Sequence, residues 1–338
     1  MKAAIFYDRE DVRIEEVPTP SPGPGEALVR NMACGICGSD KGLWLGPGAK
    51  PGIHGHESAG IVEQVGKGVD DVRPGDRVAV MAVVGCGECI DCRRGEFVYC
   101  EAGPRGRSGG FAEYQVAPAG LALPLPAGVP FEVGCLLTDA VGTPARAVRR
   151  SGIGAGDMAA VFGCGPIGLN AVQVLKAYGA SVIALDPLGY RVEAARELGA
   201  DFGVDLSRDS AVGAIRAITR VGADYVFECS GHAGKEALAS VRRAGKVAFV
   251  GECASLEISP SEDLIRRHVE VFGTWYLTRT DYLQNVRLVE KGEVDPMRVV
   301  SHLLPFEEIS RGFDIFCNHK EQALKVVLRF GQAADRSD

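Results

Sequence analysis

Four cysteines lie close together in the chain, at Cys86, Cys89, Cys92 and Cys100. The stretch around them is rich in glycine and charged residues and has no helical or strand periodicity. Four thiolates at such spacing can surround one zinc ion at about 2.3 Å each, which leaves no open coordination position. We therefore expect a structural zinc site in a lobe of about residues 85–105, where the metal contributes folding free energy. Disulfides or chance clustering are the alternatives.

A second group of metal-ligating residue types lies nearer the start of the chain. Cys37 stands in the segment Cys34 to Asp40, and His56 stands between Gly55 and Glu57. A catalytic zinc ion needs a few protein ligands and one exchangeable position, and thiolate and imidazole are suitable donors. A single histidine is more often an ordinary hydrogen-bonded residue than a ligand, so these residues alone leave the assignment open.

A glycine-rich turn follows an apolar strand that ends at Phe162. The turn has the pattern Gly-x-Gly-x-x-Gly and opens a helical stretch that runs to Tyr178. Such a turn can bring the pyrophosphate of a dinucleotide against the helix N-terminus, whereas an ordinary tight turn is the alternative. The residues that we expect at the phosphates are Gly163, Gly165, Pro166, Ile167 and Gly168.

Asp186 ends the next predicted strand, at the spacing expected of a carboxylate that accepts hydrogen bonds from the adenosine ribose. A carboxylate there would repel a 2′-phosphate, so NAD is expected rather than NADP. Arg191 lies nearby and could tolerate a phosphate, which keeps NADP as the less favoured alternative. A simple strand-end cap is the other interpretation of Asp186.

These groups must be positioned by two kinds of structure. Residues 1–141 read as short strands separated by glycine and proline, whereas residues 142–275 alternate apolar strands with helices, as in a doubly wound parallel sheet of about six strands. The tail, 276–338, contains an amphipathic helix over Asp281–Lys291 and an apolar strand over Ala323–Leu328. We expect an α/β protein whose irregular β-rich domain comprises 1–141 and 276–338 and whose dinucleotide-binding domain comprises 142–275.

Composition excludes several classes of partner. The formal net charge is −7 and the basic residues are scattered, so nothing favours binding to nucleic acid or an anionic membrane. No apolar run approaches the roughly 20 residues that a membrane-spanning helix needs, and Met1 to Asp8 do not read as a signal segment. We expect a cytoplasmic protein, and in a reducing compartment the 11 cysteines favour metal binding over disulfides.

The order of these motifs resembles the zinc-containing medium-chain alcohol and polyol dehydrogenases. The Gly-His-Glu motif, the four-cysteine lobe, the central nucleotide fold and the tail segment Ser301–Phe306 carry the resemblance across essentially the whole chain. It implies a GroES-like catalytic domain and a Rossmann domain. It also implies two zinc ions per chain, one catalytic and one structural.

The resemblance also implies roles for single residues. Cys37 and His56 would bind the catalytic zinc, and Asp40 would hydrogen-bond the second ring nitrogen of His56. Glu57 would be an outer or exchangeable ligand. The third ligand would be Asp139, with Cys135 as its competitor.

The chemistry implied is reversible hydride transfer from a secondary alcohol, such as a polyol, sugar, cyclitol or amino alcohol, to NAD. Ser39 matches the family hydroxyl that receives the substrate proton. Family members often place a histidine three residues further on, where this chain has Gly42, so Lys41, water or Glu57 must complete the proton path.

Two other functions are compatible with the motifs: a primary-alcohol dehydrogenase or aldehyde reductase, and a nucleotide-binding relative without catalysis. The family resemblance further implies a homo-oligomer, either a dimer or a tetramer.

Overall fold

The computed structural model describes residues 1–319 and 323–331 and divides the chain into two compact units. The first unit comprises Met1–Ala140, Tyr276–Val286 and the residues from Val300 onward, and the second comprises Val141–Trp275 and Arg287–Val299. The segment Arg287–Val299 therefore belongs to the second unit, whereas the sequence analysis assigned all of 276–338 to the first domain.

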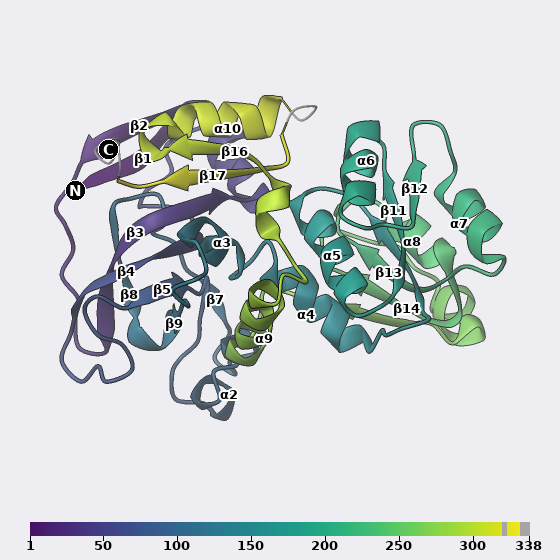
Figure 1. Cartoon of the computed structure of the whole chain (residues 1–338), viewed down its shortest axis with the longest axis horizontal. Coiled ribbons are helices and arrows are strands. Elements are labelled where there is room, and N and C mark those ends of the chain that lie inside the picture. Colours follow the sequence, from purple (N-terminus) through teal and green to yellow (C-terminus); the bar gives the residue numbers. More distant parts are fainter. Residues whose placement is uncertain (320–322, 332–338) are drawn as a thin grey trace. The chain divides into compact units, whose positions relative to one another are not determined.

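A seven-stranded mixed sheet organises the first unit (Figure 1). Its order is β16-β17-β3-β4-β5-β9, and β8 also pairs with β3. The strands of this sheet are β3 (Glu26–Ile36), β4 (Glu57–Val65), β5 (Arg77–Val80), β8 (Tyr114–Pro118), β9 (Ala122–Pro124), β16 (Val300–Pro305) and β17 (Lys325–Arg329). The last two strands bring the end of the described chain beside its beginning, because β17 pairs antiparallel with β3.

Shorter elements complete the first unit. These are the strands β1 (Lys2–Asp8), β2 (Asp11–Glu16), β6 (Val83–Val84) and β7 (Arg105–Gly106), and the helices α1 (Lys41–Leu45), α2 (Ile90–Arg93), α3 (Phe131–Leu136), α9 (Arg279–Glu290) and α10 (Ile309–Asn318). Helix α10 packs on β17 and closes an aromatic core in which Trp44 stacks on Phe313, with ring centroids 5.7 Å apart. Trp44 is a core residue.

The second unit contains a six-stranded parallel sheet in the order β12-β11-β10-β13-β14-β15. Its strands are β10 (Met158–Phe162), β11 (Ser181–Asp186), β12 (Phe202–Asp205), β13 (Ala223–Glu228), β14 (Val241–Phe249) and β15 (Glu270–Gly273), and its helices are α4 (Gly142–Ser151), α5 (Pro166–Ala177), α6 (Gly189–Glu197), α7 (Ala211–Thr219) and α8 (Gly234–Ser240). Figure 1 shows the sheet between α5 and α6 on one side and α7 and α8 on the other. Both faces of the strands are covered, which explains their continuous apolar runs.

The predicted fold class, an irregular β-rich unit combined with a doubly wound parallel sheet, is confirmed. Five of the six parallel strands were predicted by name. The sixth, β12, is a short strand at the edge of the sheet that begins at the exposed residue Phe202, so its apolar signal is weak. Among the residues that the structure describes, no helix is both long and apolar enough to cross a membrane.

A buried ion pair joins β17 to the start of β4. The ammonium nitrogen of Lys325 lies 2.7 and 2.6 Å from the two carboxylate oxygens of Glu57 and donates a hydrogen bond to the carbonyl of Ile36 at 2.8 Å. Gly35 leaves the space for this pair, because a Cβ atom there would lie 2.3 Å from the carboxylate. Burial alone would lower the pKa of Lys325, but Glu57 outweighs it and raises that pKa above its ordinary value. The pair therefore fixes a charged lysine inside the sheet.

We predict that Lys325→Met lowers the free energy of unfolding by about 3–5 kcal/mol, because it leaves the Glu57 carboxylate buried without a counter-charge. Glu57→Gln combined with Lys325→Met should recover much of this loss. Urea unfolding measures both effects. Lys2→Met is the control, since the pair of Lys2 with Glu307 is exposed and should contribute little to the free energy of unfolding. Equal losses in the two single variants would contradict the prediction.

Candidate metal and dinucleotide sites

Antiparallel pairing of β3 and β4 brings Cys37 and His56 together. In this pairing Gly35 near the end of β3 faces Glu57 at the start of β4. Cys37 directly follows β3 and His56 directly precedes β4, so the two side chains leave the sheet at the same edge. The pairing of β3 with β4 therefore brings two of the expected metal ligands, Cys37 and His56, to the same edge of the sheet.

Asp139 joins these residues from a different part of the first unit. It lies in the turn after α3, and its carboxylate oxygen Oδ2 is 3.2 Å from Nε2 of His56 and 3.5 Å from the sulfur of Cys37. One donor atom from each of Cys37, His56, Glu57 and Asp139 lies within 4.8 Å of the others. Cys135, the competing candidate, is fully buried and donates a hydrogen bond from its thiol to the carbonyl of Glu132. It is not part of this group.

Asp40 holds both of the first two residues. One of its carboxylate oxygens is 3.4 Å from Nδ1 of His56, and the other accepts a hydrogen bond from the backbone N–H of Cys37 at 2.9 Å. The carboxylate orients the imidazole so that Nε2 points toward Asp139. The contact with His56 was expected from the sequence, whereas the contact with the Cys37 backbone was not.

The charges of this group fit a bound cation. Cys37 can supply a thiolate, and the carboxylates of Asp40 and Asp139 are both buried beside His56. Burial raises the pKa of the Cys37 thiol, and Asp139 raises it further. Several buried anionic donors require a positive charge among them, because isolated buried charges are costly. A sulfur, a ring nitrogen and a carboxylate oxygen are donors that zinc commonly takes.

Ser39 lies in the short 3₁₀ turn η1 (Gly38–Asp40), two residues after Cys37. Ser39 and Gly42 are both exposed. The ammonium of Lys41 lies 5.4 Å from the ring centre of Phe316.

Two residues near the group were missed by the sequence analysis. Lys325 neutralises Glu57, and a single lysine inside the apolar strand Ala323–Leu328 was a signal that could have drawn attention to it. Tyr276 packs its ring edge-on against His56, with centroids 6.2 Å apart and planes at 90°. No local pattern in the sequence points to Tyr276.

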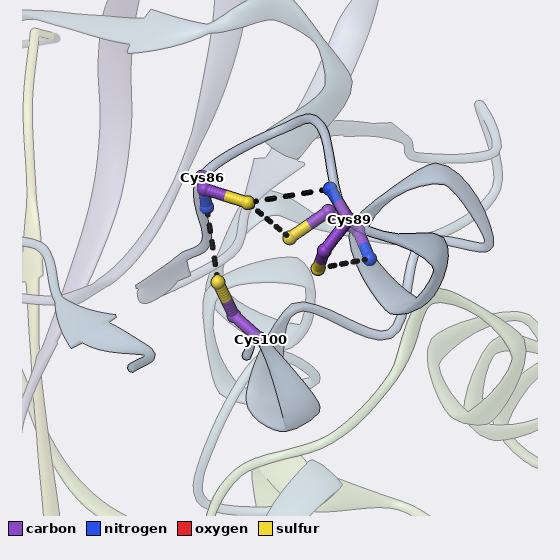
Figure 2. A group of neighbouring side chains, drawn as sticks. Cys86, Cys89 and Cys100 are labelled. Atoms are coloured by element: carbon purple, nitrogen blue, oxygen red, sulfur yellow. Dashed lines mark hydrogen bonds between the residues drawn. The ribbon is translucent and has the colours of Figure 1, made fainter. Parts of the chain in front are cut away.

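The four cysteines of the lobe also form a compact group. Their sulfur atoms lie within 4.8 Å of one another, and Figure 2 shows Cys86, Cys89 and Cys100 directing their sulfurs into one small space. The sulfur of Cys86 accepts hydrogen bonds from the backbone N–H groups of Glu88 and Cys89, each at 3.4 Å, and these lower the pKa of its thiol to about 6. All 11 cysteines lie in the described residues, and none forms a disulfide.

In the second unit, the glycine-rich turn connects β10 to α5. Gly163 has φ +87°, and a Cβ atom there would lie 2.7 Å from the side chain of Ser230. A Cβ atom at Gly168 would lie 1.8 Å from the carbonyl oxygen of Gly163, so the helix approaches the strand closely. Gly165, by contrast, faces open space apart from Arg191 at 3.9 Å, and Pro166 and Ile167 form the first turn of α5. This arrangement leaves backbone N–H groups at the start of α5 available to an anion.

Asp186 is buried at the end of β11 beside this turn. Its carboxylate accepts hydrogen bonds from the backbone N–H groups of Cys164 at 2.8 Å and Leu188 at 2.9 Å. Arg191 lies 4.0 Å from the same carboxylate. Each carboxylate oxygen has more than one lone pair, so a ribose hydroxyl could still donate to it.

Comparison with known proteins covers both units. The family described as "Alcohol dehydrogenase GroES-like domain" matches residues 23–127, and the family described as "Zinc-binding dehydrogenase" matches residues 166–291. A sorbitol dehydrogenase from Bacillus subtilis (strain 168) is 33% identical over 346 residues, which cover 97% of each chain.

Solved structures of dehydrogenases are also similar to this chain over nearly all of its length. The crystal structure of 2R,3R-butanediol dehydrogenase from Bacillus subtilis has a TM-score of 0.86 and 30% identity, with 97% of this chain and 99% of that chain covered. The RspB alcohol dehydrogenase from Escherichia coli CFT073, complexed with NADH, has a TM-score of 0.88 and 28% identity, with 98% and 99% covered. The described motifs, both units and these relatives together establish that the chain belongs to the zinc-binding medium-chain alcohol dehydrogenase family.

Proposed function

We propose that this protein is a zinc-dependent dehydrogenase that transfers a hydride from a secondary alcohol, of the polyol class, to NAD. One observation carries the proposal: Cys37, His56 and Asp139 reach a common point from three separated segments with a donor set suited to zinc. Relatives named as sorbitol and 2R,3R-butanediol dehydrogenases support the substrate class.

The residues of the first site would divide the work as follows. Cys37, His56 and Asp139 would bind the catalytic zinc, and a bound zinc ion supplies Lewis acidity toward the oxygen of the alcohol. Asp40 would keep His56 in the tautomer that leaves Nε2 as the ligand atom. Glu57 would remain an outer group, because Lys325 already neutralises it.

Ser39 would accept the proton that the alcohol loses. Its exposed position after Cys37 supports a direct transfer from its hydroxyl to water, and Gly42, three residues further on, is exposed as well. Glu57 is a poor exit for the proton because it is fully buried in its pair with Lys325. The ammonium of Lys41 contacts the ring of Phe316, which makes it a less suitable relay than water.

The second unit would bind NAD. The open approach at Gly165 and the N-terminus of α5 suit a pyrophosphate, and Asp186 beside them suits the adenosine ribose. The relative solved with NADH supports the same cofactor. Arg191 keeps NADP as the weaker alternative. The four-cysteine lobe would hold a second, structural zinc ion, and a homo-oligomer remains our expectation.

The test of this function is a substrate survey. The zinc-loaded protein is assayed for NAD and NADP reduction with polyols, sugars, cyclitols, amino alcohols, simple secondary alcohols and primary alcohols. We expect the highest kcat/KM with a polyol and NAD. A higher value with a primary alcohol would favour the alternative reductase function, and no reduction with any member of the set would contradict the proposal.

We predict that Asp139→Asn lowers the zinc content from two ions to one per chain and reduces NAD reduction by at least about 100-fold, because the neutral amide is a poor zinc ligand. Metal analysis by mass spectrometry and the NAD assay check this. Cys135→Ser is the matched control, since the thiol of Cys135 is engaged with a backbone carbonyl, and it should keep both ions. Loss of zinc from Cys135→Ser but not from Asp139→Asn would reverse the assignment.

We predict that Cys89→Ser releases the other zinc ion and lowers the thermal unfolding midpoint by several degrees, because three thiolates hold a structural zinc less tightly than four. Calorimetry together with metal analysis measures the change. Cys253→Ser serves as the control, as Cys253 is an exposed cysteine outside both groups. If Cys89→Ser kept its metal and its midpoint, the lobe would not be a zinc site.

A further inference from the structure

The four-cysteine lobe joins the rest of the first unit through a narrow neck. At this neck β6 pairs antiparallel with β7, with Val83 opposite Gly106 and Val84 opposite Arg105. All four cysteines of the lobe lie between these two strands in the chain. A pair of two-residue strands has little stability of its own. The neck therefore depends on the lobe that it closes, and the position of the chain that leaves β7 depends on the neck.

The first residue after the neck is Arg107, which is partly buried. Its guanidinium donates hydrogen bonds to the side-chain carbonyl of Gln115 at 2.8 Å and to the backbone carbonyl of Val116. Its backbone N–H donates to the carbonyl of Ala82 at 2.7 Å. Burial lowers the pKa of Arg107 to about 10, and Glu26 offsets this only in part. The guanidinium is thus held by neutral groups, at a cost in desolvation, where the chain leaves the lobe.

Gln115 connects Arg107 to two strands of the seven-stranded sheet. Its side-chain nitrogen donates hydrogen bonds to Oδ1 of Asn31 on β3 at 2.5 Å and to Oγ of Ser58 on β4 at 2.7 Å. Gln115, Asn31 and Ser58 are all buried, so water does not compete for these bonds. Ser58 is the second residue after His56. A continuous series of hydrogen bonds therefore leads from the neck of the lobe to the chain that follows His56.

A second connection runs through the backbone that follows Arg107. The N–H groups of Gly109 and Gly110 both donate to the carbonyl oxygen of Gly55, at 2.9 and 2.8 Å. A Cβ atom at Gly110 would lie 3.1 Å from that oxygen, so the glycine allows the two segments to approach closely. Gly55 directly precedes His56. The segment that leaves the lobe therefore holds the chain immediately before His56, as Gln115 holds the chain after it.

We propose that Arg107 is a positioning residue that, through Gln115, couples the four-cysteine lobe to the metal site at His56. An ion held in the lobe fixes the neck, and the neck places Arg107 and the segment after it. These in turn hold the chain on both sides of His56, so a loaded lobe raises the affinity of the other site for its ion. The inference rests on the proposed function and deepens it, because it gives the lobe a part in assembling the catalytic site.

The experiment measures the affinity of the His56 site for cobalt(II), whose absorption spectrum reports the ligands around the ion. Zinc is removed from this site by dialysis against a chelator, and cobalt(II) is then titrated into the protein. In each background, the part of the spectrum that Asp139→Asn abolishes defines the signal of this site. Wild type, Cys89→Ser, Arg107→Met and the variant that combines the last two substitutions are compared, and zinc content and thermal unfolding midpoint are recorded for each.

Arg77→Met is the matched control for Arg107→Met. Arg77 lies in the same unit, is also partly buried, and donates from its guanidinium to a backbone carbonyl, that of Val129. Its loss should lower the thermal unfolding midpoint without acting on the chain beside His56. The control thus separates a general loss of stability from a specific effect on the metal site.

We expect Cys89→Ser to bind cobalt(II) at the His56 site at least about tenfold more weakly than wild type, within the usual range of coupling between two sites. Arg107→Met should weaken binding by a similar factor, although its lobe keeps its zinc. Because both substitutions act on one path, the combined variant should bind no more weakly than Cys89→Ser alone. Arg77→Met should keep the wild-type affinity.

Four results would overturn the inference: wild-type affinity in Cys89→Ser, wild-type affinity in Arg107→Met, losses that multiply in the combined variant, or an equal loss in Arg77→Met. The titration uses neither substrate nor NAD, so it decides the coupling even if the substrate survey finds no NAD reduction. Absence of reduction would contradict the dehydrogenase function alone. A wild-type protein that takes up no cobalt(II) at the His56 site would contradict both the coupling and the zinc dependence of that function.

Discussion

The structure depends on the balance of charge at one edge of the seven-stranded sheet. Asp40 and Asp139 place their carboxylates around His56, and Cys37 adds a thiol. These groups are buried or nearly so, where uncompensated negative charge is costly. A divalent cation with affinity for sulfur, nitrogen and oxygen satisfies all of them together. The need for that cation is the physical reason for assigning metal chemistry to this edge.

The fold meets this need by bringing distant segments together. Pairing of β3 with β4 aligns Cys37 with His56, and the turn after α3 supplies Asp139. The end of the described chain contributes as well, because β17 pairs with β3 and inserts Lys325 against Glu57. Glu57 is thereby neutralised by a fixed ammonium, which leaves the other anionic groups available to the metal ion that we propose. Four separate parts of the sequence thus determine the charge of one site.

Much of this could be predicted from sequence because its motifs are local. The glycines of residues 163–168 and the four cysteines each lie within one short segment, so their spacing alone indicates their geometry. Asp139 required the resemblance to a family, since nothing near it in sequence distinguishes it from Cys135. Packing separates the two: Asp139 reaches His56, whereas the thiol of Cys135 turns to a helix carbonyl.

The remaining features depend on tertiary contacts. Lys325 and Glu57 are 268 residues apart, and the sequence around neither residue indicates that the two side chains pair. Tyr276 owes its position to a left-handed backbone and to the anchoring of α9, which leave no periodic signal in the sequence. The edge strand β12 has too little buried surface to stand out, and the assignment of Arg287–Val299 to the second unit depends on how the tail folds back. Propensity and periodicity describe local structure, and these features are not local.

Crystallography at the zinc absorption edge tests the central claim most directly. We expect an anomalous peak with Cys37, His56 and Asp139 as its protein ligands, at about 2.0–2.3 Å, and Lys325 still paired with Glu57. A zinc-loaded crystal in which no peak appears among these three residues, or in which Cys135 replaces Asp139 as a ligand, would contradict the account.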